Sequence, residues 1–516
     1  METKDSLRQR SDVAAADRND APEAAPSRRD VVKSGALIAA SAAMPLAAGG
    51  AAAQGQDVGG ATLDRLIRAA GDARRRILLK GATIISMDAA VGDFARADLL
   101  IEGKKIAAVG PALGAASQDG NAIVVDAGDR ILIPGMVDCH RHAWEGQIRG
   151  VIPNSASIGD YMAATHRGFA PFYRPEDMYA GNLATALGCL DAGITCLIDN
   201  SHNSRSSLHS DSAIQALLDS GARAVHASGQ PTFGDWDRQW TQDVARLQKQ
   251  YFASDDQLVT FRLFSRGLVK EDWEAAQRLG VWLSIDGAGA PNSAQTLAEL
   301  EKAGLLNEKR TINHGYGLPD ESWQFIRGAG IAVNACPRSD SQWALGTARM
   351  GLQEALNHGI RPGLSVDNDT AYSTDLFTEM RVGFHLQRWS AHVARIQKEA
   401  NPPALLTVRD MLEFATIRGA HNAGLAAKIG SLTPGKEADI VVIRAEDINT
   451  MPLTNAVGTV VSHAHAGNVE AVFVAGNVRK WRGALVGHDV ASVRQRIHRS
   501  RDDLFARRGI KLDILS

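Results

Sequence analysis

Two histidines separated by a single residue follow an apolar run in the first third of the chain. The run begins at Ile131 and continues through Pro134-Gly135 to His140 and His142. On an extended strand, residues two apart project to the same side, so both imidazoles would point together. Imidazole nitrogens are common ligands of divalent transition metals. Two surface histidines are the usual alternative, but the position at the end of an apolar strand favours a metal site.

Two later apolar runs also end in polar residues. Residues 310–313 are followed by His314, and residues 363–366 are followed by Asp367. A buried carboxylate is costly unless it is paired or bound to metal, and nearby histidines and a metal would compensate Asp367. Because a metal lowers the pKa of bound water towards about 7, Asp367 is also a candidate general base. The alternatives are a hydrogen-bonded core histidine for His314 and a helix N-cap for Asp367.

The elements that would position these residues alternate between strands and helices over residues 135–428. Eight apolar β runs are separated by helix-like stretches, such as 211–220 and 293–303. This alternation is typical of parallel strands with right-handed crossovers, and eight units favour a (β/α)₈ barrel over an open sheet. In such barrels the active site lies at the C-terminal ends of the strands, where the polar residues above occur.

Short β runs also lie on both sides of this region. One set falls within residues 77–134 and the other within residues 429–485, including a run at 457–461. Neither set alone buries enough apolar surface, so we expect them to form one small composite β-sandwich from both flanks of the chain. Residues 61–76 are expected to form a short helix, and 486–516 an amphipathic helix and tail.

The N-terminal 53 residues have the pattern of an export signal. The charged segment 27–33 contains Arg28-Arg29, and a short apolar run and Ala51-Ala52-Ala53 follow it. Paired arginines before such a run are typical of a Tat signal, so we expect a periplasmic or secreted protein. A disordered or amphipathic leader is the alternative. No later segment has 18 uninterrupted apolar residues, so no membrane association is expected after the signal is removed.

The composition of the chain excludes several classes of protein. The chain has 516 residues, of which 45% are hydrophobic and 22% charged, so a sizeable core is expected rather than global disorder. The formal charge of −2 argues against nucleic-acid binding driven by bulk charge. Four cysteines are too few for a disulfide scaffold. A small-molecule substrate is therefore expected, while assembly into a homo-oligomer is left open.

Several motifs in combination resemble the amidohydrolase superfamily, in particular its cytosine deaminase and triazine hydrolase (ATZ/TRZ-like) branch. The resemblance covers about residues 77–485 and rests on these motifs: Pro134-Gly135-Met136-Val137-Asp138-Cys139-His140-Arg141-His142, Asn313-His314-Gly315, Cys336-Pro337-Arg338-Ser339, Ser365-Val366-Asp367 and Gly430 to Ile440. It implies a distorted (β/α)₈ barrel, a flanking β-sandwich and one divalent metal ion. It also implies that His140, His142 and Asp367 are metal ligands, that Asp367 shuttles protons, and that His314 binds the metal or contacts its water and the substrate.

The fifth strand departs from the pattern of that family. The family has a histidine ligand there, often followed three residues later by a catalytic glutamate. Alignment puts Asp286 at the ligand position and Gly289 at the glutamate position, whereas a two-residue slip would put Ser284 at the ligand position. The resemblance makes zinc the expected metal, and an Asp286 ligand would make a harder donor set that favours iron or manganese as the alternatives. No lysine ends the fourth strand, which disfavours a binuclear centre bridged by a carbamylated lysine.

Four further residues are candidates for substrate contact. Trp144 and Gln147 follow the histidine pair, His202 ends the second strand, and Trp343 lies in the loop after Asp340. Packing under loops is the alternative for the tryptophans, and a solvated loop position is the alternative for the other two.

The leading functional hypothesis is a metal-dependent hydrolase. It would cleave a non-peptide C–N bond, such as that of an amide, urea or carbamate, through a metal-activated water. The second hypothesis is a deaminase of a purine, pyrimidine or triazine, which the missing fifth-strand histidine and glutamate disfavour. The third is a non-catalytic binding protein on a decayed barrel.

Overall fold

The computed structural model describes residues 54–114, 122–237, 240–287, 289–345 and 350–515. The expected export signal, residues 1–53, lies outside the described residues. The chain divides into two compact units at residue 58, and the site lies entirely in the second, Gly59–Ser516.

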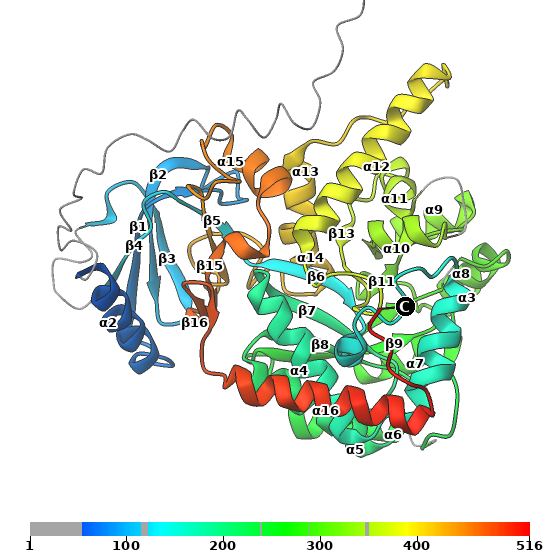
Figure 1. Cartoon of the computed structure of the whole chain (residues 1–516). Coiled ribbons are helices and arrows are strands. Elements are labelled where there is room, and N and C mark those ends of the chain that lie inside the picture. The colour runs from blue at the N-terminus through cyan, green and yellow to red at the C-terminus, as the bar shows by residue number, and fades with distance from the viewer. Residues whose placement is uncertain (1–53, 115–121, 238–239, 288, 346–349, 516) are drawn as a thin grey trace, which may run out of the picture. The chain divides into compact units, whose positions relative to one another are not determined.

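Eight parallel strands form the barrel, as predicted (Figure 1). They pair in chain order: β6 (Met136–Arg141), β7 (Ile194–Ser201), β8 (Arg223–Ser228), β9 (Val259–Ser265), β10 (Trp282–Ile285), β11 (Arg310–Asn313), β12 (Ala332–Ala335) and β13 (Gly363–Leu364). The last strand is only two residues long. A parallel bridge between Arg141 and Asp367 brings the segment after β13 against β6, so the circle of strands closes at the site itself.

Helices follow most of the strands and cover the outside of the barrel. They are α4 (Pro175–Asp191), α5 (Ser207–Ser220), α6 (Trp240–Tyr251), α7 (Lys270–Leu279), α8 (Ser293–Lys302), α9 (Asp320–Gly328), α10 (Pro337–Gln342), α11 (Gly351–Asn357) and α12 (Leu376–Ile396). Helices α5 and α7 end at Gly221 and Gly280, whose φ angles of 69° and 70° are easy only for glycine. A single glycine therefore specifies each of the two turns that lead from these helices into the next strands.

Both flanks of the chain contribute to the second sheet, as expected. The N-terminal flank supplies β1 (Arg76–Ile84), β2 (Phe94–Glu102), β3 (Lys105–Gly110), β4 (Ala122–Asp126) and β5 (Arg130–Pro134). The C-terminal flank supplies β14 (Ile440–Arg444), β15 (Val469–Val474), β16 (Asn477–Trp481) and β17 (Ala484–Leu485). The two flanks meet where β5 pairs antiparallel with β14 over Arg130–Pro134. Strand β5 then leads directly into β6, which carries the histidine pair.

A buried ion-pair cluster ties this sheet to the barrel. Arg223, at the start of β8, donates to Asp439 at 2.9 and 3.0 Å and to Glu437 at 2.5 Å, and its side chain is buried. The backbone N–H of Gly135 also donates to Asp439 O at 2.8 Å. The segment before β14 therefore holds the entry to β6.

Two sequence expectations about secondary structure differ from the structure. The run 457–461 was predicted to be a strand but is helical, in α15 (Ala456–Gly458) and the turn Thr459–His463. Asn455 caps this segment by accepting from the Gly458 N–H, and Val460 and Val461 are buried. The helix expected at 61–76 begins earlier, as α2 (Gln54–Arg68). The expected C-terminal helix is α16 (Val490–Arg508), which contacts α4.

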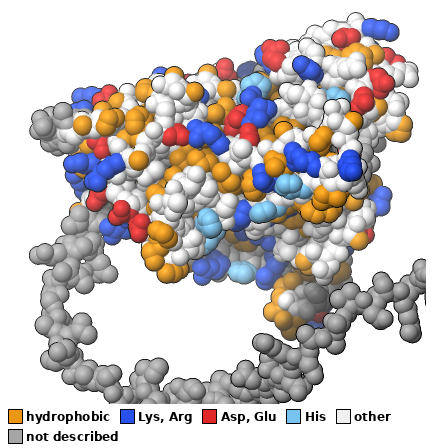
Figure 2. All heavy atoms as spheres, turned by 90° about the horizontal axis from the view of Figure 1, so that it is seen from above, with side chains coloured by type: hydrophobic (Ala, Val, Ile, Leu, Met, Phe, Trp, Pro, Cys, Tyr) orange, Lys and Arg blue, Asp and Glu red, His pale blue; other side chains and the backbone are white. Residues whose placement is uncertain are grey.

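The face in Figure 2 mixes basic, acidic and hydrophobic side chains, and neither charge dominates it. This agrees with the nearly balanced composition of the chain. Within the described residues, no helix is both long and apolar enough to span a bilayer.

Candidate active site

The histidine pair is locked to the segment after β13 by backbone hydrogen bonds. The His142 N–H donates to Asp367 O at 2.8 Å, and the Asp367 N–H donates to His140 O at 3.1 Å. Asp367 has a φ of 76° in this register, a conformation that non-glycine residues seldom adopt. Such backbone is found mainly where the surrounding fold imposes it, often at functional sites.

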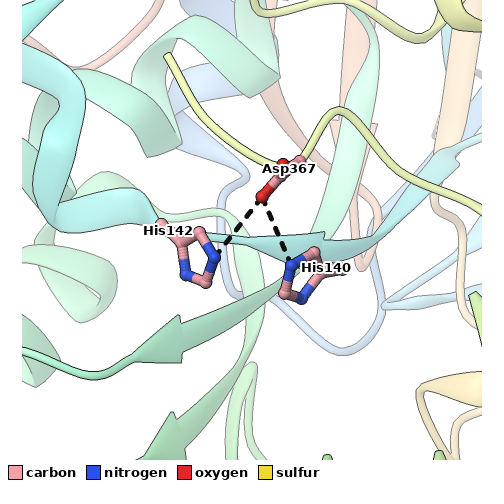
Figure 3. A group of neighbouring side chains, drawn as sticks. All are labelled: His140, His142 and Asp367. Atoms are coloured by element: carbon pink, nitrogen blue, oxygen red, sulfur yellow. Dashed lines mark ion pairs between the residues drawn. The ribbon is translucent and has the colours of Figure 1, made fainter. Parts of the chain in front are cut away.

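These backbone bonds bring three side chains together, and they point toward one another in Figure 3. Asp367 Oδ1 lies 3.3 Å from His140 Nε2 and 3.4 Å from His142 Nε2. All three residues are buried, and their ligand atoms lie within 4.8 Å of one another. The structure thus brings together the first-strand pair and the last-strand carboxylate that the sequence singled out.

The contacts of the Nδ1 atoms of His140 and His142 determine whether the Nε2 atoms of these rings can bind a metal ion. His142 Nδ1 contacts the Asn200 carbonyl oxygen at 3.0 Å, so Nδ1 carries the proton and Nε2 keeps a lone pair. His140 Nδ1 lies 2.6 Å from Asn200 Nδ2, and His140 Nε2, which faces Asp367, makes no hydrogen bond among the described residues. When the Asn200 amide is flipped, its oxygen accepts a hydrogen bond from the His140 Nδ1–H. His140 Nε2 then also keeps a lone pair. Two such nitrogens facing a carboxylate fit a divalent cation.

The environment of Asp367 favours its ionised form. Burial alone would raise the pKa of Asp367, but interactions with His140, His314 and His142 outweigh burial and lower it. The second carboxylate oxygen accepts from Ser339 Oγ at 2.7 Å and Asn368 Nδ2 at 3.1 Å. Oδ2 is therefore held by the protein, while Oδ1 faces the histidines.

His314 approaches the same centre from the end of β11. Its ring centroid lies 5.1 Å from that of His140, and its Nδ1 contacts Asp340 Oδ1 at 2.8 Å. Burial lowers the pKa of His314, but the hydrogen bond to Asp340 and nearby carboxylates raise it to about 9. Asp340 therefore fixes the ring so that Nε2 is the nitrogen left for the metal or the substrate.

The two candidates for the ligand position on the fifth strand, Asp286 and Ser284, have different surroundings. Asp286 joins His140 and His314 in a second group of converging ligand atoms, with Oδ1 at 3.6 Å from His140 Nε2. Ser284 is buried, and its hydroxyl accepts from Asn313 Nδ2 at 3.1 Å, the same amide that donates to Asp286 Oδ1. Asp286 thus lies where it could join a metal site, and its role as a ligand stays a prediction.

We therefore expect Asp286→Ala to weaken metal retention while the protein stays folded. The carboxylate lies at the cavity, and among the described residues its side-chain hydrogen-bond partner is Asn313 Nδ2, at 2.7 Å, so its loss leaves one donor without its acceptor. Metal content after dialysis against a weak chelator should fall relative to the wild type, because one ligand is missing. Unchanged zinc retention would show that Asp286 is not a ligand. Ser284→Ala is the matched control and should keep its metal.

The position aligned with the family's catalytic glutamate has no room for a side chain. A Cβ on Gly289 would lie 2.0 Å from the backbone oxygen of Tyr316, far inside van der Waals contact. Tyr316 itself lines the cavity two residues after His314. The loop after β11 therefore occupies the space that a glutamate would need.

Gly289→Ala is accordingly expected to destabilise the protein. The clash is with backbone, so it requires a loop shift, which typically costs about 1–3 kcal/mol. The control is Gly328→Ala at the end of α9, where a new Cβ meets nothing within 4 Å and should be neutral or slightly stabilising. Thermal or denaturant unfolding measures both. Equal stability of the two variants would contradict the crowding at residue 289.

A cavity of about 190 Å³ opens above the cluster. Its described lining includes His142, His314, Asp286 and Asp367 together with a largely aromatic and apolar wall: Ile158, Tyr161, Met162, His166, His202, Thr232, Arg266, Gly287, Tyr316, Trp343 and Leu345. The rings of Tyr161 and Trp343 lie 5.3 Å apart with a 32° tilt. A small planar molecule fits this surface.

The four residues predicted to contact the substrate lie at different places relative to the cavity. His202 and Trp343 line the cavity. Trp144 is fully buried beneath it and donates its indole N–H to His202 Nδ1 at 3.1 Å. Gln147 lies elsewhere, donating to Asp177 O at 3.0 Å and Ser500 Oγ at 3.3 Å, so it fastens α16 rather than meeting the cavity. Trp144 thus acts through His202, whose Nε2 is left to carry the ring proton.

Sequence reasoning missed Tyr161, His166 and Thr232 in the cavity wall. Tyr161 and His166 come from the long segment between β6 and α4, whose path no periodicity indicates. The sequence signal for Tyr161 and His166 is that aromatic and histidine side chains occur in a loop at the C-terminal ends of the barrel strands, where active sites lie.

Known proteins resemble the chain in sequence. A model described as "Amidohydrolase family" matches residues 283–479. A 5-methylthioadenosine/S-adenosylhomocysteine deaminase of Pyrococcus horikoshii is 25% identical over 440 residues, covering 81% of this chain and 97% of that protein. A 5'-deoxyadenosine deaminase of Methanobrevibacter smithii is 24% identical over 429 residues, covering 79% and 94%.

Solved structures share the fold. A zinc-containing atrazine chlorohydrolase variant from Arthrobacter aurescens has a TM-score of 0.70 at 21% identity, covering 82% of this chain and all of that one. An adenosine deaminase from Xanthomonas campestris with bound zinc has a TM-score of 0.71 at 19% identity, covering 84% and 99%. Together with the histidine pair on β6 and the carboxylate after β13, these matches show that the chain resembles the amidohydrolase family, whose model matches residues 283–479.

Proposed function

We propose that the protein hydrolyses a C–N bond other than a peptide bond in a small planar molecule, using one divalent metal ion, with zinc as the expected metal. The observation that carries this proposal is the convergence of His140 Nε2, His142 Nε2 and Asp367 Oδ1 beneath a cavity of about 190 Å³. A metal bound there lowers the pKa of a bound water from about 15.7 to about 7.

The chain's own residues then have separate tasks. Asp367 takes a proton from the attacking water and returns it to the leaving nitrogen, while Ser339 and Asn368 hold its other oxygen in place. His202 directs its Nε2–H into the cavity because Trp144 occupies Nδ1. That donor can stabilise negative charge on a carbonyl or ring atom as water adds. The aromatic wall restricts access of bulk water to the reacting bond.

Simple hydrolysis needs one proton shuttle, which Asp367 supplies. Deamination of a ring additionally needs protonation of a ring nitrogen, the task of the glutamate in deaminases of this family. The crowding of Gly289 by Tyr316 leaves no place for that group on the fifth strand. Amides, ureas and carbamates are therefore the favoured substrates.

Deamination is the second candidate, because the relatives named above are deaminases of adenosine-type compounds. The two reactions are separated by their products. Zinc-loaded protein is incubated with N-substituted amides, ureas and carbamates, which release an amine, and with 5'-methylthioadenosine and adenosine, which release ammonia. Amine release without adenosine deamination supports the first proposal. Ammonia release from the nucleosides alone would replace it with the second, and no turnover in either set would favour a binding protein.

We also propose that residues 1–53 are a Tat-type signal that directs export to the periplasm. The support is the paired Arg28-Arg29 before a short apolar run. Replacing both arginines by lysine should retain the protein in the cytoplasm, and Arg18→Lys is the matched control. Periplasmic recovery of the double variant at the wild-type level would contradict the proposal.

A further inference from the structure

One basic side chain lies in the wall of the cavity. Among the described lining residues, Arg266 is the single arginine or lysine. It follows β9 directly and is exposed at the rim of the cavity. A guanidinium has five N–H donors, and the hydrogen bond of Arg266 in this structure goes to Thr232 Oγ1, so most of its donors are available.

The position of Arg266 is set by the structure around it. Gly267 has a φ of 136°, which only glycine adopts readily, and Ser265 Oγ contacts Gly267 O at 3.0 Å and Asp272 Oδ2 at 2.6 Å. Thr232 in turn contacts His166 Nδ1 at 3.2 Å. The turn therefore holds Arg266 over the cavity rather than leaving it free to swing away.

The charge of Arg266 has no local carboxylate partner. No ion pair joins it to any acidic group in the part of the chain that the structure describes, although Asp286 and Asp272 act on it at longer range. In the proposed function, Asp286 and Asp367 are ligands of the metal ion, and the metal ion neutralises their negative charge. An arginine fork at the rim of a low-dielectric cavity is then a ready partner for a carboxylate.

We propose that the substrate is a planar amide-type molecule that carries an anionic group, and that Arg266 binds this group at the rim while the C–N bond faces the metal. The inference rests on the proposed function for the orientation of the substrate. It adds the charge of the substrate, which neither the fold nor the metal ligands specify. A neutral substrate that Arg266 contacts through a carbonyl is the alternative.

The test compares the affinity of probes that differ only in charge. The probes are 3- and 4-carboxybenzamide and their neutral isosteres 3- and 4-nitrobenzamide, titrated by calorimetry into the zinc-loaded full protein. We expect at least one carboxylate to bind about 10-fold or more tighter than its nitro isostere. Arg266→Gln should abolish that preference, Arg266→Lys should retain part of it, and Arg278→Gln on α7, outside the cavity, should retain all of it.

Three outcomes would overturn the inference. One is equal affinity of both probe types for the wild type, and another is no binding of the carboxylates. The third is a preference that survives in Arg266→Gln, which would mean that the carboxylate binds the metal instead. Turnover of the same probes is followed separately. A charge preference that depends on Arg266 without amide hydrolysis would contradict the proposed reaction and leave the anion site intact.

Discussion

Asp367→Asn is expected to lower kcat by about 1,000-fold or more, because general acid–base groups typically contribute 10²–10⁴-fold. The variant keeps the shape of the side chain but loses the charge and the ability to accept a proton. The new amide can donate toward His140 and His142, whose Nε2 atoms lie 3.3 and 3.4 Å from Oδ1. The fold should therefore survive, with a thermal midpoint close to that of the wild type.

Ser339→Ala is the matched control for that experiment. It removes one hydrogen bond, of 2.7 Å, to Asp367 Oδ2 and leaves the carboxylate itself in place. A loss of about 10-fold, and at most about 150-fold, in kcat is expected, since a single hydrogen bond to a charged group contributes about 1.5–3 kcal/mol. Near-wild-type activity of Asp367→Asn would show that another group moves the proton.

His142→Ala is expected to remove the metal and with it all turnover. The imidazole is fixed by the Asn200 carbonyl on one side and faces Asp367 on the other, so its loss removes one of the converging ligand atoms. Substitutions behind metal ligands usually cost about 10- to 100-fold in affinity, and loss of a ligand should cost at least as much. Elemental analysis of the purified variant measures the metal directly.

His202→Ala separates metal loss from general damage to the cavity. The His202 ring lies 4.0 Å from that of His142, but His202 belongs to neither group of converging ligand atoms. This variant should keep its zinc and lose activity, because the donor that Trp144 orients is gone. A His142→Ala protein that retains one zinc per chain would remove His142 from the site.

The barrel and its ligand strands were predictable because their signals are local. Apolar runs that end in His140, His314 and Asp367 specify both a strand and the polar group at its end. The composite sheet followed from two sets of runs that were each too small to be stable alone. Recognition of Asp286 instead needed the family pattern, since an Asp-Gly pair after a strand is also an ordinary turn.

Other features depend on contacts that a sequence does not display. Residues 457–461 are β-branched and apolar, which favours a strand, but Asn455 caps a helical turn and burial of Val460 and Val461 stabilises it. Gln147 lies close to the histidine pair in sequence, yet it turns toward Ser500, 353 positions away. Tyr161 and His166 reach the cavity through the tertiary path of a long loop.

The pairing of β5 with β14 has a consequence for biosynthesis. The strand that leads into the ligand pair is aligned by residues 440–444, and Asp439 anchors Gly135 at its entry. A nascent chain still lacking its last hundred residues cannot make these contacts, so the ligand geometry matures only near the end of translation. Metal capture is therefore expected to follow release from the ribosome, and stalled chains ending before residue 439 should not retain zinc.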